Sequence, residues 1–100
     1  MPYSITFRKR ATKEYLESVA WYKSRSFTAA ENFVSSVRQV LNKVQSDPIG
    51  FKKSYKDFYE AKTKRYPFSI VYFIDELKKL IVITSIFHQK EILKRNLKNN

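Results

Sequence analysis

The chain lacks cysteine and is poor in glycine, proline and histidine. Of its 100 residues none is cysteine, one is glycine, three are proline and one is histidine. The absence of cysteine excludes a disulfide framework, a thiolate zinc site and a cysteine nucleophile. A single glycine provides no glycine-rich phosphate-binding loop, and one histidine without cysteine argues against a metal cluster. No apolar run approaches the ~20 residues that a membrane span needs.

What remains is the composition of one small folded domain. The apolar fraction is 43% and the aromatic fraction 16%, enough to build a hydrophobic core. We therefore expect residues 1–100 to form a single domain without metal, cofactor or small-molecule substrate. The first residues contain neither the apolar core segment nor the cleavage site of a signal peptide, so a cytoplasmic protein that does not contact the membrane is expected.

Acidic residues are also scarce, and the chain is strongly basic. Lysine and arginine number 20 against 9 acids, which gives a net charge of +11. The excess lies in three segments, residues 1–10, 51–65 and 88–100, which carry +3, +4 and +3. A basic domain of this size is a candidate for binding nucleic acid or an acidic protein. The alternative is that the lysines only keep the protein in solution.

The first half of the chain predicts a strand followed by two helices. Residues 3–8 alternate apolar and polar side chains, which is typical of a half-buried strand. We expect Thr12 to cap a first helix that ends near residues 24–27. The segment Thr28–Glu31 matches a capping box for a second helix, which Pro48 ends. Two helices joined by a few residues predict an antiparallel hairpin.

The second half is rich in β-branched and aromatic residues. Phe68–Ile74 and Leu80–His88 are apolar on both faces, which favours two central strands joined by a short turn. Two shorter strands are expected over Tyr55–Tyr59 and Ala61–Tyr66, and Lys90–Leu97 has the spacing of a short helix. The sequence therefore predicts an α+β fold: an N-terminal strand, an antiparallel helical hairpin, then a β-meander that forms an antiparallel sheet.

A helical hairpin covers only one face of such a sheet. The other face still carries apolar side chains such as Val71, Phe73 and Phe87. Either the C-terminal tail or a protein partner must cover them.

Two motifs in the second half are distinctive. Arg65–Tyr72 reads R-Y-P-F-S-I-V-Y and is similar to a family strand R-F-P-Y-x-I-x-Y. Ile83–Lys90 follows at the matching distance and is similar to that family's closing strand with its H-x-[RK]. With the order of strand, helical hairpin and meander, the chain resembles the RelE/ParE toxins of bacterial type II toxin–antitoxin systems over nearly its whole length. It departs from the family in its tail, where Glu91–Leu93 replaces a proline and an aromatic residue.

The resemblance implies a toxin of a plasmid-stabilisation module that a cognate antitoxin neutralises. It implies one of two targets. ParE-like members act on DNA gyrase, whereas RelE-like members are metal-independent endoribonucleases that cut mRNA on the ribosome. Because the tail lacks a catalytic aromatic residue, we expect the ParE-like branch, and whether the chain is an enzyme stays open. A non-catalytic, basic nucleic-acid-binding domain is a further alternative.

Few side chains qualify for a site. His88 is the only histidine, and its ordinary pKa suits acid–base catalysis if the chain is a nuclease. The alternative is a hydrogen-bonded structural histidine. Four cations are candidates for binding phosphate or the target: Lys62, Lys64, Arg65 and Lys90. Their alternative role is a solvated strand edge that resists aggregation.

Overall fold

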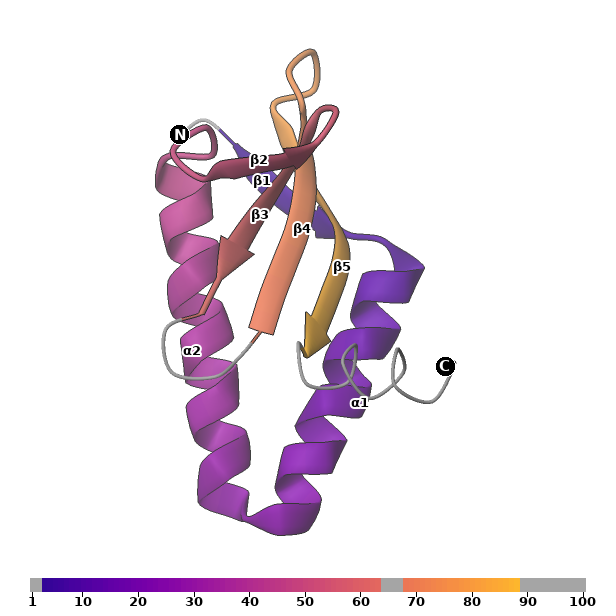
Figure 1. The fold of residues 1–100 in the computed structure, drawn as a ribbon, viewed down its shortest axis with the longest axis vertical. Helices are drawn as coiled ribbons and strands as arrows, with labels where there is room; N and C mark the ends of the chain where they lie inside the picture. The colour runs from indigo at the N-terminus through magenta and orange to yellow at the C-terminus, as the bar shows by residue number, and fades with distance from the viewer. Residues whose placement is uncertain (1–2, 64–67, 89–100) are drawn as a thin grey trace.

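The computed structural model describes residues 3–63 and 68–88. It begins with a strand and a helical hairpin and continues with four strands (Figure 1). The elements are β1 Ser4–Phe7, α1 Lys9–Arg25, α2 Phe27–Ser46, β2 Lys52–Tyr55, β3 Phe58–Lys62, β4 Phe68–Asp75 and β5 Leu80–His88. This order is the predicted α+β architecture. The helix expected over Lys90–Leu97 lies outside the described residues.

The strands form one sheet in the order β1-β5-β4-β3-β2. The meander from β2 to β5 is antiparallel, as predicted. β1 adds to β5 in parallel, with Ser4 opposite Leu80 and Phe7 opposite Ile83, so the whole sheet is mixed. A parallel neighbour requires a long crossover, and here the helical hairpin is part of it. β4 and β5 each have a strand on both sides, so they are the central strands that the sequence predicts.

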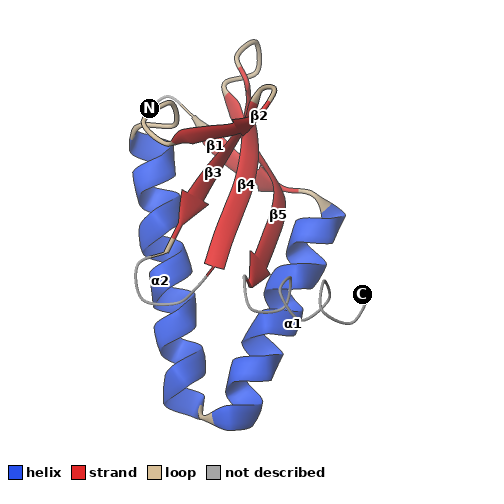
Figure 2. Ribbon diagram, viewed as in Figure 1, coloured by secondary structure: helices blue, strands red, loops and turns tan. Residues whose placement is uncertain are grey.

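Both helices pack on one face of this sheet, and the hydrophobic core lies between them (Figure 2). Phe33 of α2 stands at its centre, with ring centroids 4.3 Å from Phe68 and 5.0 Å from Tyr22. Burying one such side chain contributes roughly 1.5–3 kcal/mol. The fully buried sheet residues of this face are Ala61, Phe68, Ile70, Tyr72, Ile81, Ile83 and Ile86.

Both helices begin earlier than the sequence predicts. α1 starts at Lys9 because β1 ends there: the Arg8 N–H donates to the Ile83 carbonyl at 2.9 Å, and the helix follows at once. Thr12 lies inside the first turn and is not the cap. α2 is capped by Ser26, whose Oγ accepts from the Ala29 N–H at 3.2 Å, so the capping box predicted at Thr28 is wrong. A single residue separates the helices.

The two short strands also differ from the prediction. The predicted strand Tyr55–Tyr59 spans the turn between β2 and β3, where Lys56 adopts a φ of 50°. Left-handed φ in a tight hairpin usually marks glycine or asparagine, and lysine gave no such signal. β3 therefore begins at Phe58 and includes Lys62, and the end of the predicted strand Ala61–Tyr66 lies outside the described residues.

A β-bulge at Thr84 breaks the predicted alternation of β5. Tyr72 pairs with Ile83, but Val71 pairs with Ser85, so Thr84 is the extra residue. Ile83 and Ile86 therefore both face the helices, although strict alternation would place them on opposite faces. Strict alternation over Leu80–His88 also predicts that Thr84 shares a face with Ile86, and the bulge shows that this prediction is wrong.

The second face of the sheet, here called the open face, carries Val71, Phe73 and Phe87. All three are only half-buried. No helix in the described part of the chain packs on them. The open face is therefore the surface where an additional segment or a partner would find apolar contacts.

Candidate functional site

Two of the five predicted site residues, Lys62 and His88, lie at one end of the sheet. Lys62 ends β3 and is exposed, and its neighbour in the register is Ser69. His88 ends β5 opposite Phe68. Because β4 alone lies between them, the two backbones are about 10 Å apart. The other three predicted residues lie outside the described residues: Lys64, Arg65 and Lys90.

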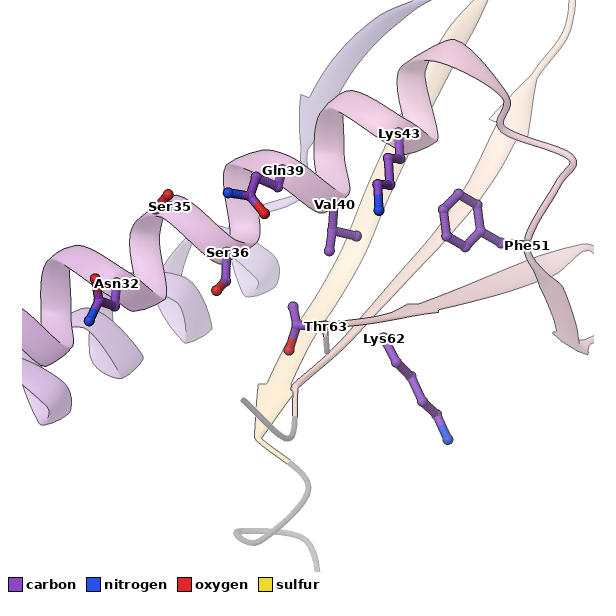
Figure 3. A pocket seen from close by; sticks show the side chains of 9 residues that line it. All are labelled: Asn32, Ser35, Ser36, Gln39, Val40, Lys43, Phe51, Lys62 and Thr63. Carbon is purple, nitrogen blue, oxygen red and sulfur yellow. The ribbon is translucent and has the colours of Figure 1, made fainter. Parts of the chain in front are cut away.

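A groove of about 500 Å³ lies beside Lys62, between α2 and the end of β3 (Figure 3). Its lining is mostly polar and comes from both elements and the loop before β2: Asn32, Ser35, Ser36, Gln39, Val40, Lys43, Phe51, Lys62 and Thr63. In Figure 3 the Lys62 side chain extends away from the α2 residues. The groove offers hydroxyl and amide groups for hydrogen bonding, but its lining contains neither a carboxylate nor a histidine.

A second groove, of about 450 Å³, lies on the open face. Its floor and walls combine aromatic, hydroxyl and charged side chains: Arg10, Glu14, Ser54, Tyr55, Phe58, Val71, Thr84, Ser85 and Phe87. Composition and motifs in the sequence do not single out this group. The only signal in the sequence is the spacing of Arg10 and Glu14, which places both on one side of a helix.

Glu14 connects α1 to the free edge of β5. β1 pairs with β5 only as far as Ile83, so the Ile86 N–H beyond it has no strand partner on that side. Glu14 supplies the acceptor: its Oε1 accepts from the Ile86 N–H at 3.0 Å and from the Ser85 hydroxyl at 2.8 Å. Its Oε2 accepts from Arg10 Nε at 3.3 Å. The carboxylate is thus occupied by structural donors.

Glu60 is bound in a similar way. It lies on β3 opposite Val71, and its Oε2 accepts from the Ser69 hydroxyl at 2.6 Å. Ser69 is fully buried, so the hydrogen bond provides its hydroxyl with an acceptor.

Tyr72 is a structural phenol. Its hydroxyl donates to the Pro48 carbonyl at 2.6 Å, which fastens the loop after α2 to the sheet. Burial raises the pKa of Tyr72 well above its ordinary value, with smaller contributions from Tyr59 and Asp47. The phenol stays protonated under ordinary conditions and is not suited to acid–base catalysis.

Two further properties of the described residues bear on function. Histidine, aspartate and glutamate side chains nowhere gather in the groups of three or more that could hold a metal ion. Neither α1 nor α2 is long and apolar enough to cross a membrane.

Comparison with solved structures identifies the fold. One chain of the intact RelBE toxin–antitoxin complex of E. coli is 20% identical over 86% of this chain and 95% of that chain, with a TM-score of 0.60. The chromosomal ParDE system of P. aeruginosa gives 16% identity, 87% and 96% coverage and a TM-score of 0.62. The YoeB dimer of Staphylococcus aureus is 17% identical over 88% of this chain and 98% of that chain, with a TM-score of 0.59. At these identities the likeness concerns the fold.

The sequence match to a family is more extensive. Residues 5–93 match the family described as "ParE toxin of type II toxin-antitoxin system, parDE". The chain therefore belongs to this family, within the RelE/ParE toxins of type II toxin–antitoxin modules, and the resemblance read from the sequence is confirmed. A search of curated proteins gave no match.

Proposed function

We propose that this toxin is ParE-like, acts on DNA gyrase in the cytoplasm and is neutralised by a cognate antitoxin. Support for the gyrase target comes from the carboxylates of the open face. Cleavage of RNA needs one group to activate the 2′-hydroxyl and another to protonate the leaving oxygen. Glu14 and Glu60 already accept hydrogen bonds from Ile86, Ser85 and Ser69, so each carboxylate has a structural role that competes with use as a general base.

Purified gyrase tests this target directly. The full chain is added to gyrase and relaxed plasmid, and supercoiling and the accumulation of cleaved DNA are measured. We expect loss of supercoiling or trapped cleavage, relieved when the antitoxin is added first. His88→Ala should leave this inhibition intact wherever the variant still melts cooperatively. Full supercoiling at a large molar excess of folded toxin would contradict the proposal.

The second candidate is a ribosome-dependent mRNA endonuclease. It is favoured by the register, which brings Lys62 and His88 to one end of the sheet with only β4 between them. In that case His88 is the acid–base group, and Lys62, Lys64, Arg65 and Lys90 bind phosphate. Primer extension on cellular mRNA after induction distinguishes the candidates. Codon-phased cuts that disappear in His88→Ala would establish the nuclease, because loss of a general acid or base costs ~10²–10⁴-fold in rate.

The antitoxin partner is proposed from the open face and from the toxin–antitoxin complexes among the similar structures. Val71, Phe73 and Phe87 offer apolar contacts, and the net charge of +11 favours an acidic segment. Expression of the toxin alone should arrest growth, and co-expression of the small gene beside it should restore growth. Unimpaired growth with confirmed expression of the folded toxin alone would contradict this role.

A further inference from the structure

The most concentrated charge in the described structure lies at the start of α1. Arg8, Lys9, Arg10 and Lys13 fall within six residues, and all four are exposed. We call them the α1 cation cluster. The first turn of α1 contains no acidic residue. The residues from Lys9 to Lys13 span only about 6 Å along the helix axis, so their charges are crowded together.

This placement is electrostatically unfavourable for the fold. The N-terminus of a helix carries the positive end of the helix dipole, where anions stabilise and cations destabilise. Within the part of the chain that the structure describes, the only ion pair of the cluster is Arg10 Nε with Glu14 at 3.3 Å. Cations that repel one another and lie at the positive end of the helix dipole do not stabilise the fold. A local conflict of this kind is expected at functional sites.

Two of the cations are held in place. The Arg8 guanidinium lies 5.6 Å from the ring centroid of Phe73 on the open face. Arg10 donates through Nε to Glu14, which is itself bound to the edge of β5, and its terminal amino groups have no acceptor among the described residues. Half of the cluster is therefore held in position, and Lys9 and Lys13 add two exposed cations beside it.

We propose that the α1 cation cluster binds the phosphate backbone of double-stranded DNA without reading its sequence. A duplex carries one negative charge per ~1.7 Å of its axis, a density that matches crowded cations better than a typical acidic peptide does. Single-stranded nucleic acid would need free aromatic faces for base stacking. Phe73 beside the cluster is already in contact with Arg8 and with the Phe58 ring at 5.7 Å, which argues against stacking there.

This inference goes beyond the gyrase proposal and can fail separately from it, because duplex binding is measured without gyrase. The probe is a fluorescent 20-base-pair duplex of arbitrary sequence, titrated with the full chain while anisotropy is recorded. If three to four phosphates are contacted, the affinity should fall about 40- to 150-fold between 50 and 200 mM salt. A second duplex of scrambled sequence should bind equally well.

A charge-matched pair of variants locates the contact. The cluster variant is Arg8→Gln/Lys9→Gln/Lys13→Gln, which retains the Arg10–Glu14 pair. The control is Lys23→Gln/Arg38→Gln/Lys78→Gln, which removes the same charge from exposed positions elsewhere. Lys23 lies about 21 Å from Lys9 along α1. The cluster variant should lose about tenfold or more in affinity and about one unit of salt slope per contact, whereas the control should bind like the wild type.

Thermal melting separates binding from folding. Because less repulsion at a helix N-terminus offsets the loss of the Arg8–Phe73 contact, the cluster variant should melt close to the temperature of the wild type. Equal loss of duplex binding in both variants would overturn the proposal, since general charge would then explain it. So would cluster-dependent binding that prefers a single-stranded RNA or an acidic peptide of equal charge over the duplex.

Discussion

Replacing Glu14 tests whether the hydrogen bonds of its carboxylate hold α1 to the sheet, or whether the carboxylate only lines the groove on the open face. Three donors converge on it: the Ile86 N–H at 3.0 Å, the Ser85 hydroxyl at 2.8 Å and Arg10 Nε at 3.3 Å. The substitution Glu14→Ala removes every acceptor. It leaves the Ile86 N–H at a strand edge that β1 does not reach.

The magnitude follows from the kind of bonds lost. Hydrogen bonds to a charged group contribute ~1.5–3 kcal/mol, but these donors are only part-buried, so water compensates some of the loss. The Arg10 pair is largely exposed and adds at most ~0.5 kcal/mol. We expect Glu14→Ala to cost about 2 kcal/mol of unfolding free energy. In a domain of this size that lowers the melting temperature by about 8–16 °C.

Two companion variants sharpen the test. Glu14→Gln keeps an oxygen that can accept from Ile86 and Ser85, so it should cost about half as much as the alanine variant. Glu17→Ala changes the same residue type on the same helix, at an exposed position whose side chain makes no hydrogen bond or ion pair in the described structure. Urea unfolding followed by circular dichroism gives all three free energies. If Glu14→Ala and Glu17→Ala differ by less than ~0.5 kcal/mol, Glu14 does not hold α1 to β5.

The other predictions concern the core. Tyr72→Phe removes the hydroxyl that donates to the Pro48 carbonyl and should cost about 1–2 kcal/mol in urea unfolding, and a cost near zero would mean that this loop needs no anchor. Because the pKa of Tyr72 is raised by folding, the phenol contributes stability that is complete below the ordinary pKa of 10.0 and is lost as the pH rises above it. Between pH 10 and 12 the wild type should therefore lose up to ~1.4 kcal/mol per pH unit more than Tyr72→Phe, and parallel stability curves would refute the assignment. Phe33→Ala should cost about 3–5 kcal/mol because the ring is fully buried between Phe68 and Tyr22, whereas Phe27→Ala, 64% exposed, should cost less than ~1 kcal/mol; similar melting temperatures for both would contradict the described core.

The long periodic elements could be predicted from the sequence because their patterns extend over many residues. The strands Phe68–Ile74 and Leu80–His88 were placed within a residue of β4 and β5, and their central position followed from apolar side chains on both faces. The second helix of the hairpin has a similar pattern, since Phe33, Val37 and Leu41 recur at the spacing of one helix face. Such patterns mark the face of each element that is buried in the folded protein, so they can be recognised in the sequence alone.

The shorter features depended on single residues and were missed. The residue type of Lys56 does not indicate a left-handed φ, and that of Thr84 does not indicate a bulge. Both conformations are set by pairing with the neighbouring strand. The predicted first residues of the helices were wrong for a related reason. Thr12 is an ordinary cap residue, but the last sheet hydrogen bond, from the Arg8 N–H, fixes the start of α1 at Lys9.

The candidate site likewise has parts that local sequence patterns predict and parts that depend on contacts between distant segments. His88 could be placed at a strand end from the sequence, whereas Lys62 was expected near the start of a strand and instead ends β3. Their relation across β4 came only with the register. Glu14 could not have been selected, because its importance depends on an amide 72 residues further along the chain. A contact between distant segments leaves no local pattern in the sequence.

The acidic residues explain why the positive charge of this protein is so available to a partner. Several of its few carboxylates accept hydrogen bonds from hydroxyl or backbone groups: Glu14 from Ser85 and Ile86, Glu60 from Ser69, and Asp75 from the Lys78 N–H. Only two ion pairs, Arg10–Glu14 and Lys79–Glu76, occur among the described residues. Most cations are therefore not neutralised within the domain. If they served only to keep the protein in solution, an even distribution would suffice, whereas the crowding at the positive end of α1 is unfavourable for stability and would be offset by the anionic partner proposed above.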